Sequence, residues 1–186
     1  MELILVRHGH RDVPLQSHTG NPPLSARGIQ HALHVATALK VEPIERIVSS
    51  GMRRADATAE PLADALGLVV ETHADLGEID RWGGEYANVE TIRQKGPEEL
   101  QRFRDAPIAY FGIDADRFRR ETLAAFRSIL HDNTGAKTAI FTHGISRRTR
   151  CRSPRHARSC ASSHCRSKTE RRANLSRRLR VCSFTI

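Results

Sequence analysis

Two histidines, His8 and His143, stand in the same sequence setting, each after a short apolar run and directly before a glycine. The apolar runs cover residues 2–6 and 137–141, and both predict buried strands. Parallel strands finish at one edge of a sheet, which is where ligands bind in α/β folds. A neutral imidazole can attack an electrophile or donate a hydrogen bond. The pattern therefore predicts a site built from two histidines.

Arginines in two segments point to an anionic ligand. Arg7 precedes His8, and Arg54 follows a further predicted strand. A guanidinium group presents a planar fork of donors that suits the oxygens of a phosphoryl group. Its positive charge would also keep a neighbouring imidazole neutral and therefore nucleophilic. Arg53 competes with Arg54 for this role, and the spacing to the alanine and threonine that follow favours Arg54.

A carboxyl group is the third requirement, because an oxygen that leaves phosphorus needs a proton. Glu78, in a loop after the third predicted strand, is the candidate, although Glu85 lies close to it in sequence. Asn21 and Thr19 follow His8 in a polar loop and are candidates for contact with a substrate. The remaining polar candidates are expected at the surface, and they are His10, Arg11, His18, His31, His34, His73 and His131.

The elements that would position these residues alternate between strands and helices. Strands are predicted at residues 2–6, 44–48, 68–72 and 137–141, and helices at about 25–39, 52–66, 98–104 and 114–131. Ser25 suits the N-cap of the first helix, and Gly67 suits the left-handed C-cap of the second. The buried stripe of the first helix is expected to comprise Ile29, Ala32, Leu33, Ala36 and Leu39. Residues 73–109 are rich in Gly and Pro, which predicts mostly loop.

This alternation predicts an α/β fold, a three-layer sandwich with a mostly parallel central sheet flanked by helices. The length of 186 residues suits one domain. The predicted pattern is incomplete at the C-terminus, because residues after 144 are basic and contain few apolar positions.

Four motifs occur in an order that resembles the histidine phosphatase superfamily, the group that includes cofactor-dependent phosphoglycerate mutases. They are Arg7-His8-Gly9, the segment from Ser49 to Ala59, Leu76-Gly77-Glu78 and Thr142-His143-Gly144, and residues 23–32 resemble the family's approach to its first helix. The resemblance covers roughly residues 1–144. It implies that Arg7, His8, Arg54 and His143 form a phosphate pocket, that His8 becomes phosphorylated, and that neither a metal nor a cofactor is needed.

The residue after the second histidine distinguishes two branches of that family. The acid-phosphatase branch has an Asp there, whereas this chain has Gly144. The resemblance therefore implies the mutase-like branch, with Glu78 as the proton donor. The short segment between Glu78 and the last strand favours a simple phosphatase over a mutase.

The charge of the chain is concentrated in its last segment. The net charge of the whole chain is +9, but residues 145–186 hold 13 of the basic residues and only one acidic residue, Glu170. This leaves residues 1–144 mildly acidic, with 17 basic residues against 20 acidic ones. All four cysteines also lie in the last segment. A change of composition directly after an intact motif leads to the hypothesis that residues 145–186 are translated out of frame and are disordered.

The composition of the tail allows two other interpretations. An arginine-rich segment can bind polyanions through phosphate contacts, but interleaved aromatic residues for base stacking are missing, so only non-specific binding of nucleic acid is expected. A metal site is not expected, because the residues that could form it lack a paired Cys-x-x-Cys; they are Cys151, His156, Cys160, His164 and Cys165.

The sequence thus predicts a metal-independent phosphatase of small phosphate esters, with a phosphoglycerate mutase-type transfer as the alternative. A catalytically inactive domain with a polyanion-binding tail is the second alternative. The family's helix and strand beyond the second histidine are missing from the pattern, which would weaken activity. No membrane-spanning run and no signal peptide are evident, so a cytoplasmic location is expected.

Overall fold

A five-stranded sheet forms the centre of the protein in the computed structural model, which describes residues 2–12, 21–82, 89–132, 136–144 and 182–184. The strand order is β3-β2-β4-β1-β5, and every pair of neighbours is parallel. The strands are β1 (Glu2–Arg7), β2 (Ile44–Ser49), β3 (Val70–Thr72), β4 (Lys137–Thr142) and β5 (Cys182–Phe184). The predicted parallel sheet is therefore confirmed, with a third strand that begins two residues later than expected.

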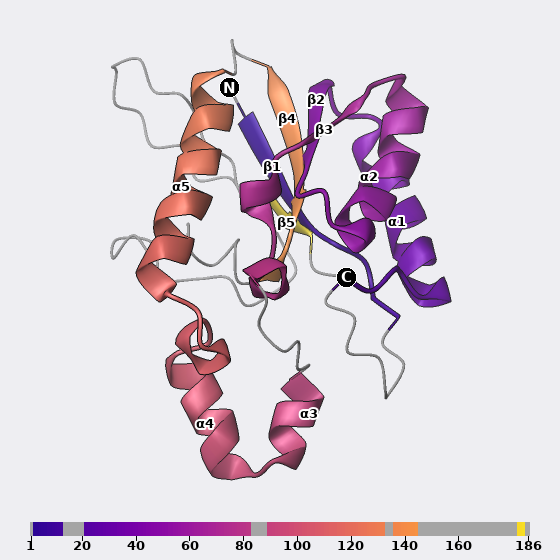
Figure 1. The fold of residues 1–186 in the computed structure, drawn as a ribbon. Coiled ribbons are helices and arrows are strands. Elements are labelled where there is room, and N and C mark those ends of the chain that lie inside the picture. The colour runs from indigo at the N-terminus through magenta and orange to yellow at the C-terminus, as the bar shows by residue number, and fades with distance from the viewer. Residues whose placement is uncertain (1, 13–20, 83–88, 133–135, 145–181, 185–186) are drawn as a thin grey trace, which may run out of the picture.

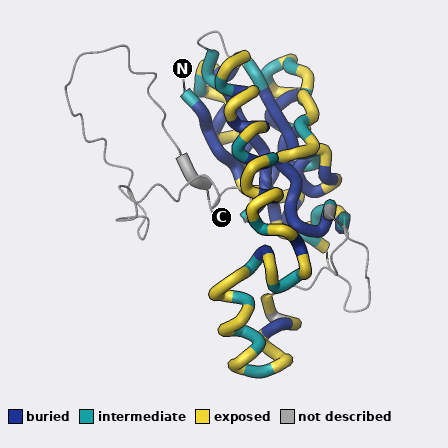
Figure 2. Tube along the Cα trace, turned by 60° about the vertical axis from the view of Figure 1, so that its left-hand side comes forward, coloured by how far each residue is buried: buried dark blue, intermediate teal, exposed yellow. Residues whose placement is uncertain are grey.

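Helices cover both faces of this sheet and give three layers (Figure 1). Helices α1 (Ala26–Leu39) and α2 (Arg53–Leu66) lie on one face, and α5 (Ala115–His131) lies on the other. Alternate residues of β1 point to opposite faces, as a strand's period of two requires. Ile4 and Val6 pack with α1 and α2, while Leu3 and Leu5 pack with α5. Burial on both faces explains the continuous apolar run of β1, and Figure 2 shows the resulting buried centre.

The stripe that α1 buries differs from the predicted one. Ile29 and Leu33 are 51% and 45% exposed, whereas Val35 is buried. The physical reason is Gly28, because a Cβ at this residue would lie 1.9 Å from the carbonyl oxygen of His10. Gly28 therefore faces the loop after β1, and this contact fixes the rotation of α1 about its own axis. In this rotation Ile29 and Leu33 are exposed. The N-cap prediction is confirmed, since the Ser25 hydroxyl accepts a hydrogen bond from the Gly28 N–H.

Helix α2 buries a stripe that includes a charged residue, Arg54, together with Ala55, Thr58, Ala59 and Leu62. Its C-cap is Gly67 with φ of 64°, the left-handed conformation that the sequence predicted.

The segment between β3 and α5 holds more short helices than expected. They are η1 (Ala74–Leu76), η2 (Ile79–Trp82), α3 (Val89–Gln94), α4 (Pro97–Asp105) and η3 (Ala109–Phe111). Of these, only α4 was predicted, at 98–104. Helices α3 and α4 project as a hairpin beyond the end of the sheet at which β1 and β4 finish (Figures 1 and 2).

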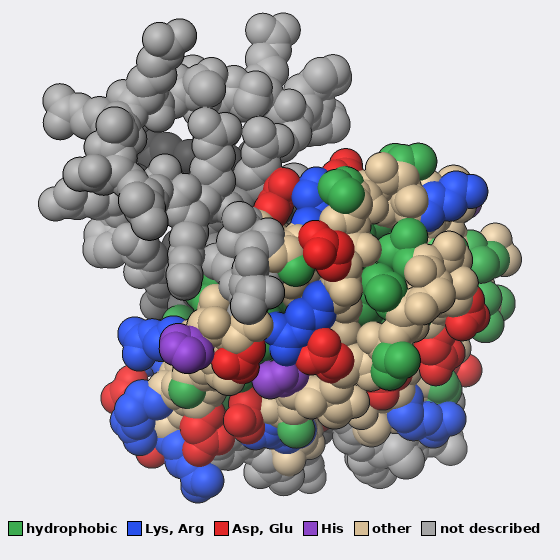
Figure 3. Space-filling view, turned by 90° about the horizontal axis from the view of Figure 1, so that it is seen from above, with side chains coloured by type: hydrophobic (Ala, Val, Ile, Leu, Met, Phe, Trp, Pro, Cys, Tyr) green, Lys and Arg blue, Asp and Glu red, His purple; other side chains and the backbone are tan. Residues whose placement is uncertain are grey.

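The predicted tail lies outside the described residues except for the three residues of β5, which lie beside β1. In the described part of the chain, no helix combines the length and the apolarity that a membrane crossing requires. Acidic and basic side chains are interspersed on the described surface seen in Figure 3, in keeping with the mildly acidic composition of residues 1–144.

Candidate active site

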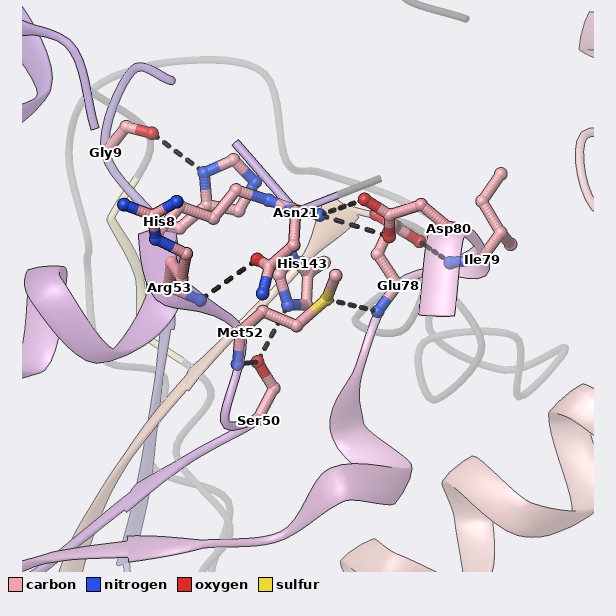
Figure 4. Close-up of polar contacts among 11 residues, drawn as sticks. His8, Gly9, Asn21, Ser50, Met52, Arg53, Glu78, Ile79, Asp80 and His143 are labelled. Atoms are coloured by element: carbon pink, nitrogen blue, oxygen red, sulfur yellow. Dashed lines mark hydrogen bonds and ion pairs between the residues drawn. The ribbon is translucent and has the colours of Figure 1, made fainter. Parts of the chain in front are cut away.

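The strand order brings the two histidines together. Strands β1 and β4 are neighbours, and the pairing extends past β1 because the His8 N–H donates to the carbonyl oxygen of Thr142 at 3.0 Å. The imidazole rings of His8 and His143 have their centroids 5.0 Å apart and their planes inclined by 52°. Figure 4 shows both rings at the centre of a cluster of polar contacts. A sheet edge with two adjacent imidazoles is what the sequence predicted.

A hydrogen bond fixes the tautomer of His8. Its Nδ1 lies 2.8 Å from the carbonyl oxygen of Gly9. A carbonyl can only accept, so Nδ1 carries the proton and Nε2 carries the lone pair. Burial, followed by the charge of Arg54, lowers the pKa of His8 to about 3, and Arg7 and Arg11 contribute further. His8 is therefore neutral at physiological pH, with a nucleophilic nitrogen available.

The loop that carries His8 is tied to helix α2. The N–H of Gly9 donates to the hydroxyl oxygen of Thr58 at 3.0 Å, and this hydroxyl donates to the carbonyl oxygen of Arg54 at 2.6 Å. A Cβ on Gly9 would lie 2.6 Å from the carbonyl oxygen of Gly28, so the loop also lies tightly against α1. These contacts hold the backbone on the C-terminal side of His8.

His143 is fully buried and is oriented by a serine. Its Nε2 lies 2.8 Å from Oγ of Ser50, which follows β2. Its Nδ1 is buried and has no hydrogen-bond partner among the described residues. Burial, and then the neighbouring His8 and Arg54, lower the pKa of His143 well below the ordinary value. His143 is therefore a neutral imidazole with one ring nitrogen left for a ligand.

Two of the predicted arginines border this pair of rings. Arg54 is completely buried, and its Nη2 donates to both oxygens of Asp80, at 2.9 and 3.2 Å. Arg53 is exposed, and its N–H donates to Oδ1 of Asn21 at 3.0 Å. Arg54 rather than Arg53 thus belongs to the buried cluster. Arg7 lies beside the second histidine's glycine, since a Cβ on Gly144 would lie 3.7 Å from Cζ of Arg7.

Arg11 was predicted to lie at the surface, and this prediction was wrong. It is half-buried, and its charge lowers the pKa of both His8 and His143. Its own pKa falls to about 10, because burial and the charge of Arg54 oppose its protonation. A backbone bridge between Arg11 and Leu24 keeps this residue beside the site. No periodic signal in the sequence marks the bridge, so the third arginine could not be found from spacing.

Glu78 directly precedes η2 and Asp80 lies in it, and both carboxyl groups lie on this side of the site (Figure 4). Glu78 is buried, its N–H donates to Sδ of Met52 at 3.4 Å, and its charge raises the pKa of Arg11. Burial raises the pKa of Asp80, and the Arg54 guanidinium opposes the rise. Asp80 was missed by sequence reasoning. The competing Glu85 and the candidate Thr19 lie outside the described residues.

The other histidines, all expected at the surface, differ in their exposure among the described residues. His10, His34 and His131 are exposed, as predicted, while His31 and His73 are half-buried. His18 lies outside the described residues, as do the tail residues considered for a metal site. Among the described residues, no group of three or more His, Cys, Asp or Glu side chains could hold a metal ion.

The lowered pKa values of His8 and His143 predict that acid destabilises the protein. The ordinary histidine pKa of 6.5 applies to the unfolded chain, and the value for His8 in the fold is about 3. Between these values the unfolded chain binds more protons, so the free energy of unfolding falls as the pH falls below about 6.5. We expect urea unfolding to show lower stability at pH 5 than at pH 7.

Two variants test whether His8 causes this loss of stability at low pH. In His8→Gln the drop between pH 7 and pH 5 is expected to be smaller than in the unmodified protein. The matched control is His10→Gln, because His10 is exposed, and its drop is expected to match that of the unmodified protein. An equal drop in both variants would show that His8 takes up its proton with an ordinary pKa.

Known proteins share this sequence pattern and this fold. The sequence model of the histidine phosphatase superfamily (branch 1) matches residues 3–157. Probable phosphoglycerate mutase GpmB of Escherichia fergusonii is 33% identical over 156 residues, which span 78% of this chain and 71% of that protein. Phosphoserine phosphatase 1 of Hydrogenobacter thermophilus is 35% identical over 112 residues, or 58% of this chain and 52% of that protein.

Two solved structures show the same fold. A mycobacterial glucosyl-3-phosphoglycerate phosphatase in complex with VO3 aligns with a TM-score of 0.64 at 23% identity, covering 78% of this chain and 77% of that one. A phosphoglycerate mutase from Bacillus anthracis aligns with a TM-score of 0.60 at 21% identity, covering 83% and 81%. The family match, which covers most of the chain, and the two neighbouring histidines lead to one conclusion: this chain belongs to the histidine phosphatase superfamily (branch 1).

Proposed function

We propose that this protein is a phosphatase that hydrolyses a small phosphate ester through a phosphohistidine at His8. The observation that carries the proposal is the pair of neutral imidazoles with centroids 5.0 Å apart. His8 has its lone pair on Nε2, and His143 has a buried Nδ1 without a partner among the described residues. A nucleophile and a hydrogen-bonding group at this separation can share one tetrahedral anion. The nearby arginines supply the positive charge that such an anion requires.

The first chemical step transfers the phosphoryl group to His8. The Nε2 lone pair of His8 forms a bond to phosphorus while the bond from phosphorus to the ester oxygen breaks. Glu78, in its protonated form, gives its proton to the departing oxygen, and an alcohol leaves. Arg7 and Arg54 hold the other phosphoryl oxygens, and His143 donates a hydrogen bond to one of them.

The second step returns the enzyme to its starting state. A water molecule attacks phosphorus, and the Glu78 carboxylate accepts a proton from this water. The bond between phosphorus and Nε2 breaks, which releases inorganic phosphate and restores neutral His8. Splitting one difficult displacement into two steps in this way is the general advantage of a covalent intermediate. No metal or cofactor has a role in this scheme.

The relatives support the substrate class. One relative is named a phosphoserine phosphatase, and a structural neighbour is named a glucosyl-3-phosphoglycerate phosphatase. Both names describe removal of a phosphate from a small molecule. Other relatives are named phosphoglycerate mutases, so the alternative is transfer of the phosphoryl group from His8 to an acceptor hydroxyl rather than to water. Release of inorganic phosphate with one ester and no acceptor distinguishes the phosphatase.

Trapping the intermediate tests the covalent step. The protein is mixed with a radiolabelled phosphate ester and quenched in alkali, in which a phosphohistidine survives. We expect the label on the peptide that contains His8, at up to one equivalent when substrate is saturating. Turnover without label on this peptide would contradict a covalent route through His8, and label on a peptide containing His143 would reverse the two roles.

We propose further that residues 1–144 carry the catalytic function and that the protein is cytoplasmic. In the basic segment 145–186, the described residues are those of β5, which extends the sheet beside β1. The hypothesis that the tail is translated out of frame can be tested in the gene sequence. Another reading frame after codon 144 should encode an apolar helix and a strand, as in the resembled family. If no frame encodes them, the hypothesis of out-of-frame translation fails.

A further inference from the structure

Among the described residues, Ser50 is the one whose hydroxyl contacts His143. The hydrogen bonds of this hydroxyl indicate where its own proton points and which ring nitrogen of His143 carries a proton. The hydroxyl oxygen accepts from the N–H of Met52 at 3.4 Å and lies 2.8 Å from Nε2 of His143. A serine hydroxyl carries one proton to donate and two lone pairs. The backbone N–H occupies one lone pair. If Nε2–H of His143 donated to the other, the hydroxyl proton would have no acceptor among the described residues, so donation from the hydroxyl to Nε2 satisfies both groups. In this arrangement Nε2 is unprotonated and the proton of the neutral ring sits on Nδ1.

The position of Ser50 is itself fixed by the sheet. Its N–H donates to the carbonyl oxygen of Phe141 at 3.2 Å, which joins the end of β2 to β4 two residues before His143. Ser50 is 3% exposed and His143 is 0% exposed, so water competes little for this hydrogen bond. In the view of Figure 4, the His143 ring lies between Ser50 and the His8 ring.

We propose that Ser50 is a positioning residue, which holds His143 in the tautomer whose Nδ1–H donates to a phosphoryl oxygen bound at His8. The opposite tautomer would present a lone pair at Nδ1 to an anion, which repels it. Nothing among the described residues satisfies Nδ1, which fits a group that waits for a ligand. The role in turnover rests on the proposed phosphatase function, whereas the tautomer of His143 is a property of the free protein.

The neighbouring serine provides a matched control. Ser49 is also buried, but its hydroxyl donates to Oδ1 of Asp56 at 2.5 Å and not to a histidine. Ser49→Ala therefore removes a hydroxyl of the same kind, from the adjacent residue, without touching His143. A merely structural role of Ser50 predicts that Ser49→Ala and Ser50→Ala have similar effects.

The first measurement is nitrogen NMR of the full-length protein with labelled histidines. The His143 signals are assigned by their absence in His143→Gln. In the unmodified protein we expect a protonated Nδ1 and an unprotonated Nε2 at neutral pH. A protonated Nε2 would overturn the proposal, whether or not the protein hydrolyses esters. In Ser50→Ala we expect a mixture of the two tautomers, and in Ser49→Ala no change.

The second measurement is hydrolysis of a chromogenic phosphate ester. Ser50→Ala is expected to lower kcat about 10- to 100-fold with a change in KM below about threefold, because one oriented donor to the phosphoryl oxygens is lost. Ser50→Thr keeps the hydroxyl and is expected to recover most of kcat. An unchanged kcat in Ser50→Ala, or an equal loss in Ser49→Ala, would overturn the role. If the unmodified protein shows no hydrolysis at all, the phosphatase function fails, and NMR alone decides the tautomer.

Discussion

Replacing His8 with Ala is expected to lower kcat for a chromogenic phosphate ester by at least about 10³-fold, because the variant has no nucleophile to carry the phosphoryl group. The Nε2 lone pair of His8 is the one available on this ring, since Nδ1 donates to the Gly9 carbonyl. The nearest candidate to replace it, Nδ1 of His143, is expected to carry a proton. Steady-state rates, measured alongside circular dichroism to check the fold, test this expectation.

The matched control for this substitution is His10→Ala. His10 lies two residues further along the same loop, is exposed, and its Nδ1 lies 2.8 Å from the Ser25 hydroxyl. Its loss removes an imidazole of the same kind without removing the proposed nucleophile, so kcat is expected to change less than about threefold. Rates that survive in His8→Ala, or that fall equally in His10→Ala, would mean that catalysis does not pass through His8.

Removing the carboxylate of Asp80 is expected to produce the largest loss of stability among single substitutions near the site. Asp80 and Arg54 both have fully buried side chains, joined at 2.9 Å. Breaking a buried ion pair by removing one partner leaves an uncompensated charge and costs about 3–5 kcal/mol. We therefore expect Asp80→Ala to lower the free energy of unfolding in urea by about this amount. Activity should fall as well, because Arg54 loses the group that orients it.

Two comparisons separate the effect of charge from that of a missing side chain. Arg119→Ala breaks the exposed pair between Arg119 and Asp116 and is expected to cost below about 1 kcal/mol. The double variant Asp80→Ala/Arg54→Met removes both buried charges and is expected to recover part of the lost stability while staying inactive. A double variant less stable than Asp80→Ala would argue that the buried charge of Arg54 is not the cause of the loss.

The sequence predicted the sheet well because β1 and β4 bury both of their faces. Apolar runs of this kind leave few alternatives, and the two histidines at their ends follow directly. Arg54 was also predictable, since it lies on the same stripe of α2 as Ala55, Thr58 and Ala59. A helix stripe that includes an arginine signals a buried charge, which requires a partner.

The partners of these residues could not be read from spacing, because they come from irregular segments. Asp80 lies in η2, Arg11 lies after β1, and Ser50 follows β2. Each lies at the site because separate chain segments meet there, and no periodic pattern in the sequence indicates which segments meet. The rotation of α1 was mispredicted for a related reason, since a single backbone contact at Gly28 decided which apolar residues face inward.

The adjacency of β1 and β4 determines when the two histidines can come together during synthesis. Glu2 pairs with Lys137, so the two strands that deliver the histidines are among the most distant segments of the domain along the chain. Closing so long a loop is entropically unfavourable, and topologies dominated by distant pairings fold slowly. During synthesis, β1 cannot pair with β4 until nearly the whole domain has been translated. His8, the proposed nucleophile, is thus synthesised first, and its partner imidazole, His143, follows only after the intervening strands and helices.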